Sequence, residues 1–416
     1  MKNKYVKELE IYIHIPFCVR KCNYCDFLSF ACDEDTQNRY IKALLKEIES
    51  WGRNINKGYK VVSVFIGGGT PAILKADYIK MLMEALKDMF KIADNAEITI
   101  EANPGTLDSE KLQIYKAAGI NRLSMGLQSA KDAELKMLGR IHDYETFESN
   151  YYEARKTGFN NISIDLISAL PGQNEDGFRE TLEKVIRLNP EHISVYGLIV
   201  EPGTVFYNLY EGDSREVAKD IISAFLYPDG SKKELPDEDT ERNIYYLTNR
   251  LLSENGYKQY EISNYSKDGY ESVHNKGYWI RREYLGMGLG ASSMLENIRW
   301  KNTEEINEYL DASLCKDTLL EISYDYLSSE SGIIREVEAL DKENQMSEEM
   351  FLGLRMNKGV SVKAFSDKYM ISPLDKWKEW INKMTEDGLL EITEDLYIRL
   401  TDSGRDLANY VMSEFV

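Results

Sequence analysis

The sequence lacks any long apolar run. None of its 416 residues belongs to a stretch approaching the roughly eighteen apolar residues that a membrane-spanning helix needs. The first residues, MKNKYVKELE, also lack the apolar core of a signal peptide. With 43% hydrophobic residues the composition is that of an ordinary globular chain. We therefore expect a cytoplasmic protein without an integral membrane segment.

Positive charge is also in short supply. The chain has 51 Lys and Arg against 70 Asp and Glu, which gives a formal net charge of −19. Such a surface repels the phosphate backbones of nucleic acids and anionic lipids alike. We expect no nucleic-acid partner, and solubility alone would also explain the acidity.

Cysteine is scarce, with five residues in the whole chain, yet three of them lie within eight positions. Cys18, Cys22 and Cys25 have the spacing C-x3-C-x2-C and directly follow an alternating run, Ile11 to Ile15, that predicts a strand. This clustering indicates a shared ligand. Cys32 and Cys315 lie outside the spacing and are expected to be unligated thiols.

The number of thiols favours one ligand over the others. Structural zinc requires four nitrogen or sulfur donors, and no second C-x2-C or H-x3-H pair follows. A disulfide would leave one of the three thiols over. A [4Fe–4S] cluster normally takes four cysteines. Three would leave one iron open to bind a small molecule, and this is the interpretation that we favour over zinc and a disulfide.

Strand and helix patterns alternate through the first half of the chain and predict an α/β fold with a parallel sheet. Six units rather than eight favour a partial (β/α)6 TIM-like barrel; a doubly wound sheet is the alternative. Strands are expected at 11–15, 61–66, 97–101, 122–127, 162–167 and 192–198, and helices at 35–51, 79–90, 109–118, 144–156 and 176–188. Ligands of either fold bind at the carboxyl ends of the strands.

Polar and glycine residues follow these predicted strands. The first are Gly67 to Gly69 with Thr70, where glycines let the backbone approach a ligand closely. Glu101, Gln128 with Arg140 beyond it, and Asp165 lie at or just past later strand ends. Each alone could be a cap, a turn or a surface charge. Their recurrence on successive strands predicts one converging site.

The alternation stops near residue 200, and the sequence predicts three parts, 1–200, 201–300 and 301–416. Residues 228–240 are polar and predict an exposed loop. Helices expected at 346–354, 362–369 and 373–387, followed by a short strand pattern and a final helix, form a smaller winged-helix-like C-terminal domain. DNA binding by this domain is disfavoured because the segment is acidic.

Several motifs together resemble the HemN/HemW family of radical S-adenosylmethionine (SAM) proteins, which contains oxygen-independent coproporphyrinogen oxidases and related haem chaperones. They are Tyr12 and His14, the cysteine spacing with Tyr24 and Phe27, GGGTP at 67–71, IEANP at 100–104, RLSMGLQS at 122–129, LGRIH at 138–142 and IDLISALPGQ at 164–173. The last motif departs from the family at Ser168 and Ala169, where an aromatic residue and a glycine are common.

The resemblance implies a radical SAM barrel with two cofactors. Cys18, Cys22 and Cys25 would ligate a [4Fe–4S] cluster, whose open iron chelates the methionine amino and carboxylate groups of SAM. The SAM methionyl group would lie on Gly68, Gly69 and Thr70. The rest of the SAM pocket would be lined by Tyr12, Glu101, Gln128, Arg140 and Asp165.

The resemblance also implies haem as a ligand. His274, Asn275, Tyr278 and Trp279 match the H-N-x-x-Y-W stretch of the haem chaperones of this family. Imidazole is a common axial haem ligand, and the aromatic side chains could cover a porphyrin face. A histidine bonded within the domain core is the alternative. Because this stretch lies far along the chain from the cysteines, we expect haem to bind independently of the cluster.

Three functions fit this resemblance: a haem chaperone that transfers haem to an acceptor haemoprotein, a coproporphyrinogen III dehydrogenase, and another radical SAM enzyme acting on a porphyrin. The oxidases carry a fourth cysteine two positions after the third, where this chain has Phe27, and a longer segment before the motif. These differences favour the chaperone, and no catalytic residue is assigned.

Overall fold

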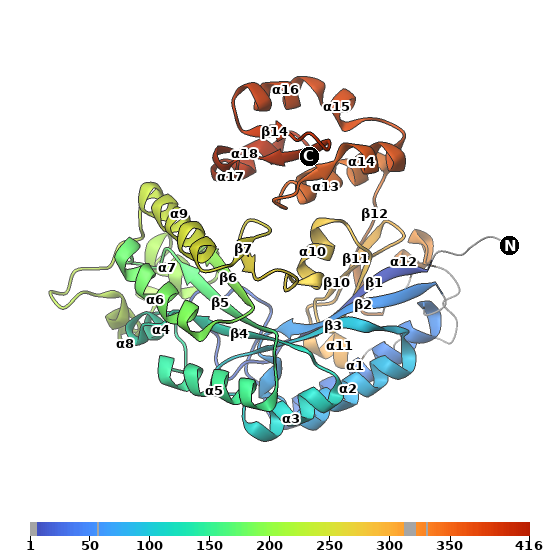
Figure 1. The fold of residues 1–416 in the computed structure, drawn as a ribbon. Coiled ribbons are helices and arrows are strands. Elements are labelled where there is room, and N and C mark those ends of the chain that lie inside the picture. The colour runs from blue at the N-terminus through green and yellow to red at the C-terminus, as the bar shows by residue number, and fades with distance from the viewer. Residues whose placement is uncertain (1–5, 56–57, 312–321, 330–331) are drawn as a thin grey trace.

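The computed structural model describes residues 6–55, 58–311, 322–329 and 332–416. Its main feature is a twelve-stranded sheet with the order β12-β11-β10-β9-β1-β2-β3-β4-β5-β6-β8-β7 (Figure 1). The first six strands are β1 (Lys7–Ile15), β2 (Tyr59–Gly68), β3 (Ile92–Ala102), β4 (Arg122–Gln128), β5 (Ile162–Ser168) and β6 (His192–Gly197).

The order of these six strands decides between the two predicted α/β folds. They are parallel and lie side by side in chain order, so every crossover advances in the same direction. A doubly wound sheet would reverse its order partway. The partial (β/α)6 barrel is therefore confirmed.

Helices connect the strands and form an outer layer around the curved sheet (Figure 1). They are α1 (Glu34–Ile55), α2 (Ala76–Met89), α3 (Ser109–Ala118), α4 (Asp132–Met137), α5 (Tyr144–Thr157) and α6 (Glu175–Leu188). The main hydrophobic core lies between this layer and the sheet, where alternate residues such as Ile11, Ile13 and Ile15 of β1 are fully buried. Both α3 and α5 begin at an aspartate that caps the first turn and end at a glycine in the left-handed conformation.

The opposite, inward faces of the strands are unusually polar. Residues alternating with the core positions include Glu10, Glu97, Arg122, Ser163 and His192, all buried. Strands buried on both faces are commonly near-continuous apolar runs. The polar inner face therefore indicates a barrel that encloses a polar site.

The sheet continues beyond the predicted barrel at both edges. Beside β1 lie β9 (Tyr284–Met287), which is parallel to it, and then the antiparallel β10 (Ser292–Leu295), β11 (Ile298–Asn302) and β12 (Ile334–Ala339). Beside β6 lie β8 (Asn264–Ser266) and β7 (Lys258–Gln259). The sequence pattern predicted none of these strands.

Other segments between β6 and β12 are short helices, apart from one longer one. They are α7 (Val205–Tyr210), α8 (Lys219–Ile222), α9 (Glu238–Glu254), α10 (Val273–Trp279), α11 (Ile306–Asp311) and α12 (Tyr324–Ser329). The predicted loop at 228–240 ends earlier than expected, because Asp237 caps α9 by accepting the Thr240 N–H. Cys315, expected to be an unligated thiol, lies outside the described residues.

The C-terminal domain has its own hydrophobic core, which includes Met346, Phe365, Ile381, Ile398 and Val411. It packs α13 (Lys342–Gly353), α14 (Val362–Tyr369), α15 (Pro373–Lys376), α16 (Lys378–Glu386), α17 (Asp402–Asp406) and α18 (Ala408–Ser413) with a sheet of β13 (Val360–Ser361), β15 (Tyr397–Leu400) and β14 (Leu390–Ile392). The helix expected at 373–387 is broken at Trp377, whose non-helical backbone lets its ring pack on Phe365 and Phe415.

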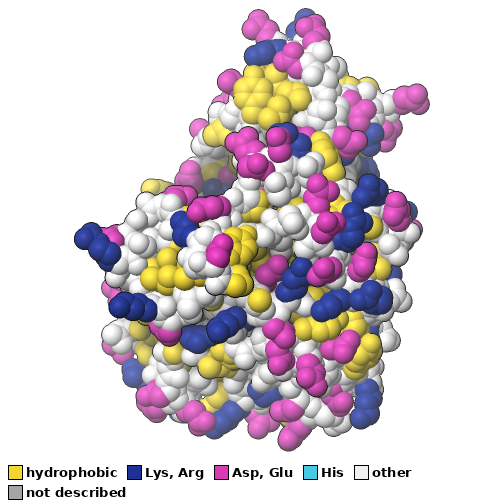
Figure 2. All heavy atoms as spheres, turned by 90° about the vertical axis from the view of Figure 1, so that its left-hand side faces the viewer, with side chains coloured by type: hydrophobic (Ala, Val, Ile, Leu, Met, Phe, Trp, Pro, Cys, Tyr) yellow, Lys and Arg dark blue, Asp and Glu magenta, His cyan; other side chains and the backbone are white. Residues whose placement is uncertain are grey.

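Acidic and basic side chains are interspersed over the face shown in Figure 2, with hydrophobic patches between them. None of the helices in the described part of the chain combines the length and the apolar character needed to cross a bilayer.

Candidate functional site

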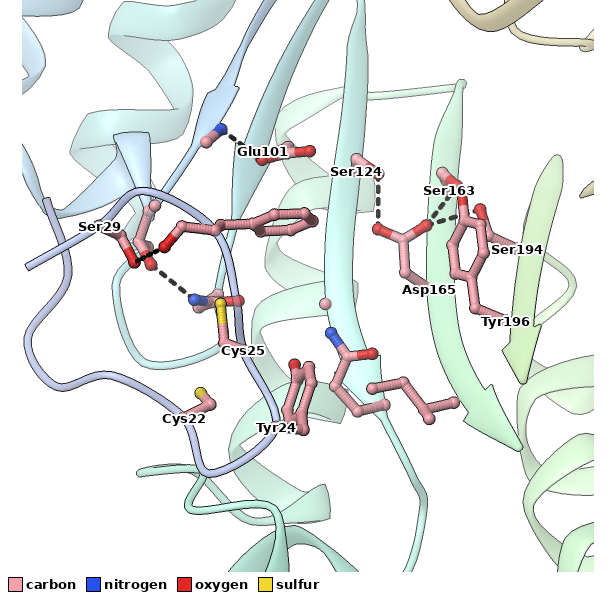
Figure 3. A pocket seen from close by; sticks show the side chains of 18 of the residues that line it. Cys22, Tyr24, Cys25, Ser29, Glu101, Ser124, Ser163, Asp165, Ser194 and Tyr196 are labelled. Atoms are coloured by element: carbon pink, nitrogen blue, oxygen red, sulfur yellow. Dashed lines mark hydrogen bonds between the residues drawn. The ribbon is translucent and has the colours of Figure 1, made fainter. Parts of the chain in front are cut away.

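A cavity of about 570 Å³ opens among the carboxyl ends of the barrel strands and extends into the barrel (Figure 3). All three motif cysteines line it, as do all eight residues expected to contact SAM. These residues are Cys18, Cys22, Cys25, Tyr12, Gly68, Gly69, Thr70, Glu101, Gln128, Arg140 and Asp165. The structure thus brings the predicted set together.

The cysteine loop is fixed at both of its sides. Its ends are joined by the Cys18 N–H to Phe30 O bond, 3.0 Å, and the Phe30 N–H to Pro16 O bond, 2.9 Å. In its middle, Asn23 donates its side-chain amide to Met137 O at 2.8 Å. The three half-buried thiols therefore face the cavity from a tethered backbone.

The arrangement of these thiols bears on the choice of metal. Among the described residues, no three His, Cys, Asp or Glu side chains lie close enough together to hold a single metal ion. A zinc ion needs its donors about 2.3 Å away on every side. The three thiols line one cavity, as ligands of a shared cluster would have to.

Two glycines let the turn after β2 pack directly on the cysteine loop. A Cβ on Gly68, whose φ is +111°, would lie 2.5 Å from the His14 ring. A Cβ on Gly69 would lie 2.6 Å from Phe17 O. The backbones are joined there by the Gly69 N–H to Ile15 O and Thr70 N–H to Phe17 O bonds, both 2.8 Å. Only glycine permits this close approach.

A hydrogen-bonded chain links the turn to the cysteines. Asn103 donates to Thr70 Oγ1 at 2.7 Å and accepts from Arg140 Nη2 at 2.6 Å. Arg140 Nη1 lies 3.5 Å from Cys22 Sγ, and Thr70 Oγ1 lies 3.5 Å from Cys18 Sγ. The turn, Asn103 and Arg140 thus form one connected network beside the cysteine loop.

Arg140, expected to line the SAM pocket, already makes hydrogen bonds within the protein. Its Nη2 is bonded to Asn103 and also donates to Gly126 O at 2.8 Å. Its Nε has no hydrogen-bond partner among the described residues.

Two carboxylates at the rim have different environments. Glu101 Oε2 accepts the Gly68 N–H at 3.0 Å. Burial, together with the charge of Asp165, raises the pKa of Glu101 to about 8. Asp165 instead accepts hydroxyl groups from Ser124 at 2.7 Å, Ser194 at 2.8 Å and Ser163 at 3.2 Å (Figure 3). Glu101 is thus mostly protonated at neutral pH while hydroxyl donors surround Asp165.

Gln128 reaches the cavity because β4 bulges. The pairing of β4 with β5 shifts between Gly126 and Gln128, and Gln128 has a φ of +72°. Bulges of this kind redirect side chains and are common beside functional sites. The spacing of residues along the sequence does not indicate this bulge.

Tyr12 is positioned through His14. The His14 Nε2–H donates to Leu28 O at 2.9 Å, which leaves Nδ1 to accept the Tyr12 hydroxyl at 3.0 Å. The imidazole therefore joins the first strand to the cysteine loop.

The H-N-x-x-Y-W stretch lies on α10 and its residues divide between two places. His274, Asn275 and Tyr278 line the cavity, whereas Trp279 packs under the Arg355 guanidinium, 4.4 Å from its ring centre. Because His274 and the cysteines line one cavity, the expectation that this stretch would lie apart from the cysteines is wrong. That haem binds independently of the cluster stays a prediction. Separation along the chain was no guide to separation in space.

His274 is engaged on both ring nitrogens. Nδ1 bonds Ser63 Oγ at 2.9 Å and Nε2 bonds the Tyr278 hydroxyl at 3.1 Å, while the ring stacks on Phe65. Burial and the nearby charges of Arg122 and Arg282 lower its pKa to about 3, so the imidazole is neutral. Ligation of haem iron would require one of these two hydrogen bonds to open.

Sequence reasoning missed the residues that support the site. Asn103 lies within the IEANP motif and could have been found there, since it is the polar residue two positions after Glu101. The cavity is also lined by Arg122, Ser124, Ser163, His192 and Ser194. The alternation of polar residues along the predicted buried strands could have indicated them.

Comparison with known proteins agrees with this geometry. The Radical SAM superfamily model matches residues 12–185, and the HemN C-terminal domain model matches residues 340–407. The solved structure of coproporphyrinogen III oxidase (HemN) from Escherichia coli has a TM-score of 0.79 and 23% identity, covering 99% of this chain and 91% of that one. The fold and the cysteine site are those of a radical SAM protein, a class whose cofactors are a [4Fe–4S] cluster and SAM.

Similarity over nearly the full length defines the family further. The chain is 36% identical to "Heme chaperone HemW" of Bacillus subtilis (strain 168), over 97% of this chain and 98% of that protein. It is 35% identical to "Heme chaperone HemW" of Lactococcus lactis subsp. lactis (strain IL1403), over 97% and 96%. The chain belongs to the HemW family of radical SAM proteins.

Proposed function

We propose that this protein is a haem chaperone, which binds haem and transfers it to an acceptor haemoprotein. The names of its near-full-length relatives support this, and so does the single residue Phe27. Phe27 stands where the oxidases of the wider family have a fourth cysteine, and its side chain is 67% exposed at the cavity mouth. An exposed aromatic ring beside a cavity suits contact with a flat apolar ligand.

The proposed cofactor site uses the residues at the mouth of the cavity. Cys18, Cys22 and Cys25 would hold a [4Fe–4S] cluster, which when bound supplies an open iron for the amino acid end of SAM. Arg140 and Thr70 would hold the thiolates in place. Glu101 and Asp165 would accept hydrogen bonds from the cationic and hydroxyl groups of SAM, because both face the same cavity from β3 and β5, the two strands that flank β4.

The haem site is proposed to include His274, Asn275 and Tyr278, with Trp279 holding α10 against the C-terminal domain. Three of these residues line the cavity, and one hydrogen bond of His274 would open on ligation.

The function is tested by two assays of the same preparation. Purified protein is titrated with haem in air, and reconstituted protein is incubated anaerobically with coproporphyrinogen III, SAM and a reductant. A saturable Soret band without oxidised porphyrin product supports the chaperone. Product formation would instead indicate a coproporphyrinogen III dehydrogenase, and the absence of both would reject both functions.

The cluster assignment is tested separately by substitution. Cys22→Ala is expected to abolish the visible absorbance of the cluster and to lower the bound iron after anaerobic reconstitution, because two thiolates hold the cluster poorly. Cys32→Ala is the matched control, since Cys32 lies outside the cavity. Equal loss of iron in both variants would contradict the three-ligand site.

A further inference from the structure

We propose that the inner end of the barrel cavity, around Arg122, is a binding site for a carboxylate group. Arg122 is the first residue of β4, and Gln128, the last, lines the mouth of the same cavity. At roughly 3.3 Å per residue these positions are about 20 Å apart along the strand. The Arg122 site is therefore distinct from the cysteine loop and the rim.

The guanidinium of Arg122 is buried without adequate compensation. The side chain is 2% exposed. Its Nε has no hydrogen-bond partner among the described residues. Within the same part of the chain the only carboxylate within 4 Å is that of Glu97, whose Oε2 lies 3.9 Å from Nε. Such a charge, taken out of water, strongly favours a ligand of opposite sign.

Glu97 is not free to supply that charge, because it already binds the start of α10. Its Oε2 accepts the Val273 N–H at 3.1 Å and its Oε1 the His274 N–H at 3.1 Å. Ser272 Oγ lies 3.5 Å from Oε1. The carboxylate thus satisfies unpaired helix amides, and Arg122 is left facing the cavity.

The remaining groups at the inner end are neutral. Burial, with the Arg122 charge, keeps the pKa of both His192 and His274 low, so neither imidazole is charged. Ser163 Oγ bonds His192 Nδ1 at 2.8 Å and so stands between this layer and Asp165 above it. Apart from Arg122 and Glu97, the inner end therefore holds neutral hydrogen-bonding groups.

A carboxylate is the anion that this site fits. A guanidinium presents parallel N–H groups that match two carboxylate oxygens. The carboxylate of SAM is expected at the opposite end, beside the cysteines. The Arg122 ligand therefore belongs to a second molecule in the cavity. If the proposed function holds, that molecule is haem, through one propionate; the other source is a free small carboxylate.

Wild-type protein tests the inference without any substitution. Haem and haem dimethyl ester, whose propionates are uncharged, are titrated in parallel and followed by the Soret band. A charged hydrogen-bonded pair predicts about tenfold or greater preference for haem. Sodium propionate is then compared with sodium chloride at equal concentration in thermal unfolding.

A variant assigns the effect to Arg122. Arg122→Met is expected to remove both the preference for haem over its ester and the stabilisation by propionate, while Arg122→Lys retains part of each. In both variants Glu97 still accepts hydrogen bonds from the backbone N–H groups at the start of α10, and these bonds favour folding. If Arg122→Met does not fold, the wild-type titrations and the Arg122→Lys variant still test the carboxylate site.

The outcomes separate the two proposals. Preference for haem over its ester that depends on Arg122 supports a propionate site. Equal affinity for both porphyrins, with stabilisation by propionate, assigns the site to a free small carboxylate. Equal affinity without that stabilisation overturns the carboxylate site but leaves the haem chaperone. Absence of haem binding rejects the chaperone, and propionate then tests the Arg122 site alone.

Discussion

The protonation state of Glu101 is expected to be coupled to the binding of SAM. Because its pKa is about 8, most molecules carry a proton on Glu101 at pH 7. SAM brings positive charge, and binding it beside Glu101 favours the ionised carboxylate. The proton must leave when SAM binds, and this costs affinity at low pH.

We therefore predict that SAM affinity of the reconstituted protein rises as pH increases from 6.5 to 8, by up to about tenfold per pH unit below the pKa, and then levels off. Calorimetry at several pH values measures this. Glu101→Gln should bind more weakly and with little pH dependence. A wild-type affinity that is as flat as that of the variant would remove Glu101 from the SAM site.

Ala169 occupies a backbone conformation that suits glycine. It lies just after β5 with a φ of +60° and is buried. This is one of the two positions at which the chain departs from the common family motif. An L-residue with a Cβ is disfavoured in the left-handed region by about 1 kcal/mol.

Ala169→Gly is accordingly predicted to raise the free energy of unfolding by about 0.5 to 1 kcal/mol, measured by urea denaturation. Ala154→Gly is the matched control, since Ala154 is buried within α5, where glycine costs about 1 kcal/mol. If Ala169→Gly destabilises as much as the control, the backbone at 169 carries no strain that glycine relieves.

At the scale of elements, the barrel was predictable because its strands and helices differ in period. The helix expected at 109–118 coincides with α3, and strands such as β5 extend the predicted range by one residue. Rim residues followed from the rule that parallel strands present their carboxyl ends at one edge. The cavity residues expected at the rim were found on that basis.

The strands from β7 to β12 were not predictable in the same way. They are short, from two to six residues, and β9 pairs with β1, more than 270 positions earlier. Their pairing depends on strands that are distant in the sequence, and a local residue pattern does not identify those partners. The same reason explains why α10 and its His274 were expected away from the cysteines.

One buried residue, Glu47 of α1, joins that helix to the later strands. Its carboxylate accepts the Gly288 N–H at 2.9 Å, the Asn302 amide at 2.7 Å and the Tyr309 hydroxyl at 2.6 Å. Removing it would leave three buried donors without an acceptor.

Glu47→Ala is predicted to lower the free energy of unfolding by about 3 kcal/mol or more, measured by chemical denaturation. Glu49→Ala on the same helix removes only an exposed pair with Arg53 and should change stability by less than about 1 kcal/mol. Equal effects of the two substitutions would show that Glu47 does not hold the helix to the sheet.

At the scale of the molecule, a buried carboxylate contributes to the contact between the C-terminal domain and the barrel. Glu348 of α13 accepts Arg281 Nε at 2.8 Å and also binds Arg299. Arg281 lies between α10 and β9, and Arg299 lies in β11, so both belong to the part of the chain that extends the barrel sheet beside β1.

Glu348→Ala removes the carboxylate partner of the buried Arg281 guanidinium, and we predict a loss of about 3 kcal/mol in docking. Calorimetric unfolding should separate into two transitions, and proteases should cleave the connection between β12 and α13 faster. Glu349→Ala is the control, because Glu349 bonds Lys368 and Tyr369, both inside the C-terminal domain. A single unchanged transition in Glu348→Ala would reject this role.

Because the inner face of the barrel is polar, the cellular half-life of the protein should depend on ligand binding. Charged and hydroxyl groups there lower the stability of the empty barrel, and a ligand present at a hundred times its dissociation constant restores about 2.7 kcal/mol. Differences of that size change how much of a protein escapes proteolysis in a cell. The steady-state amount of this protein should therefore follow the supply of whatever fills the cavity, so that scarcity of a cofactor would be read out as scarcity of the protein itself.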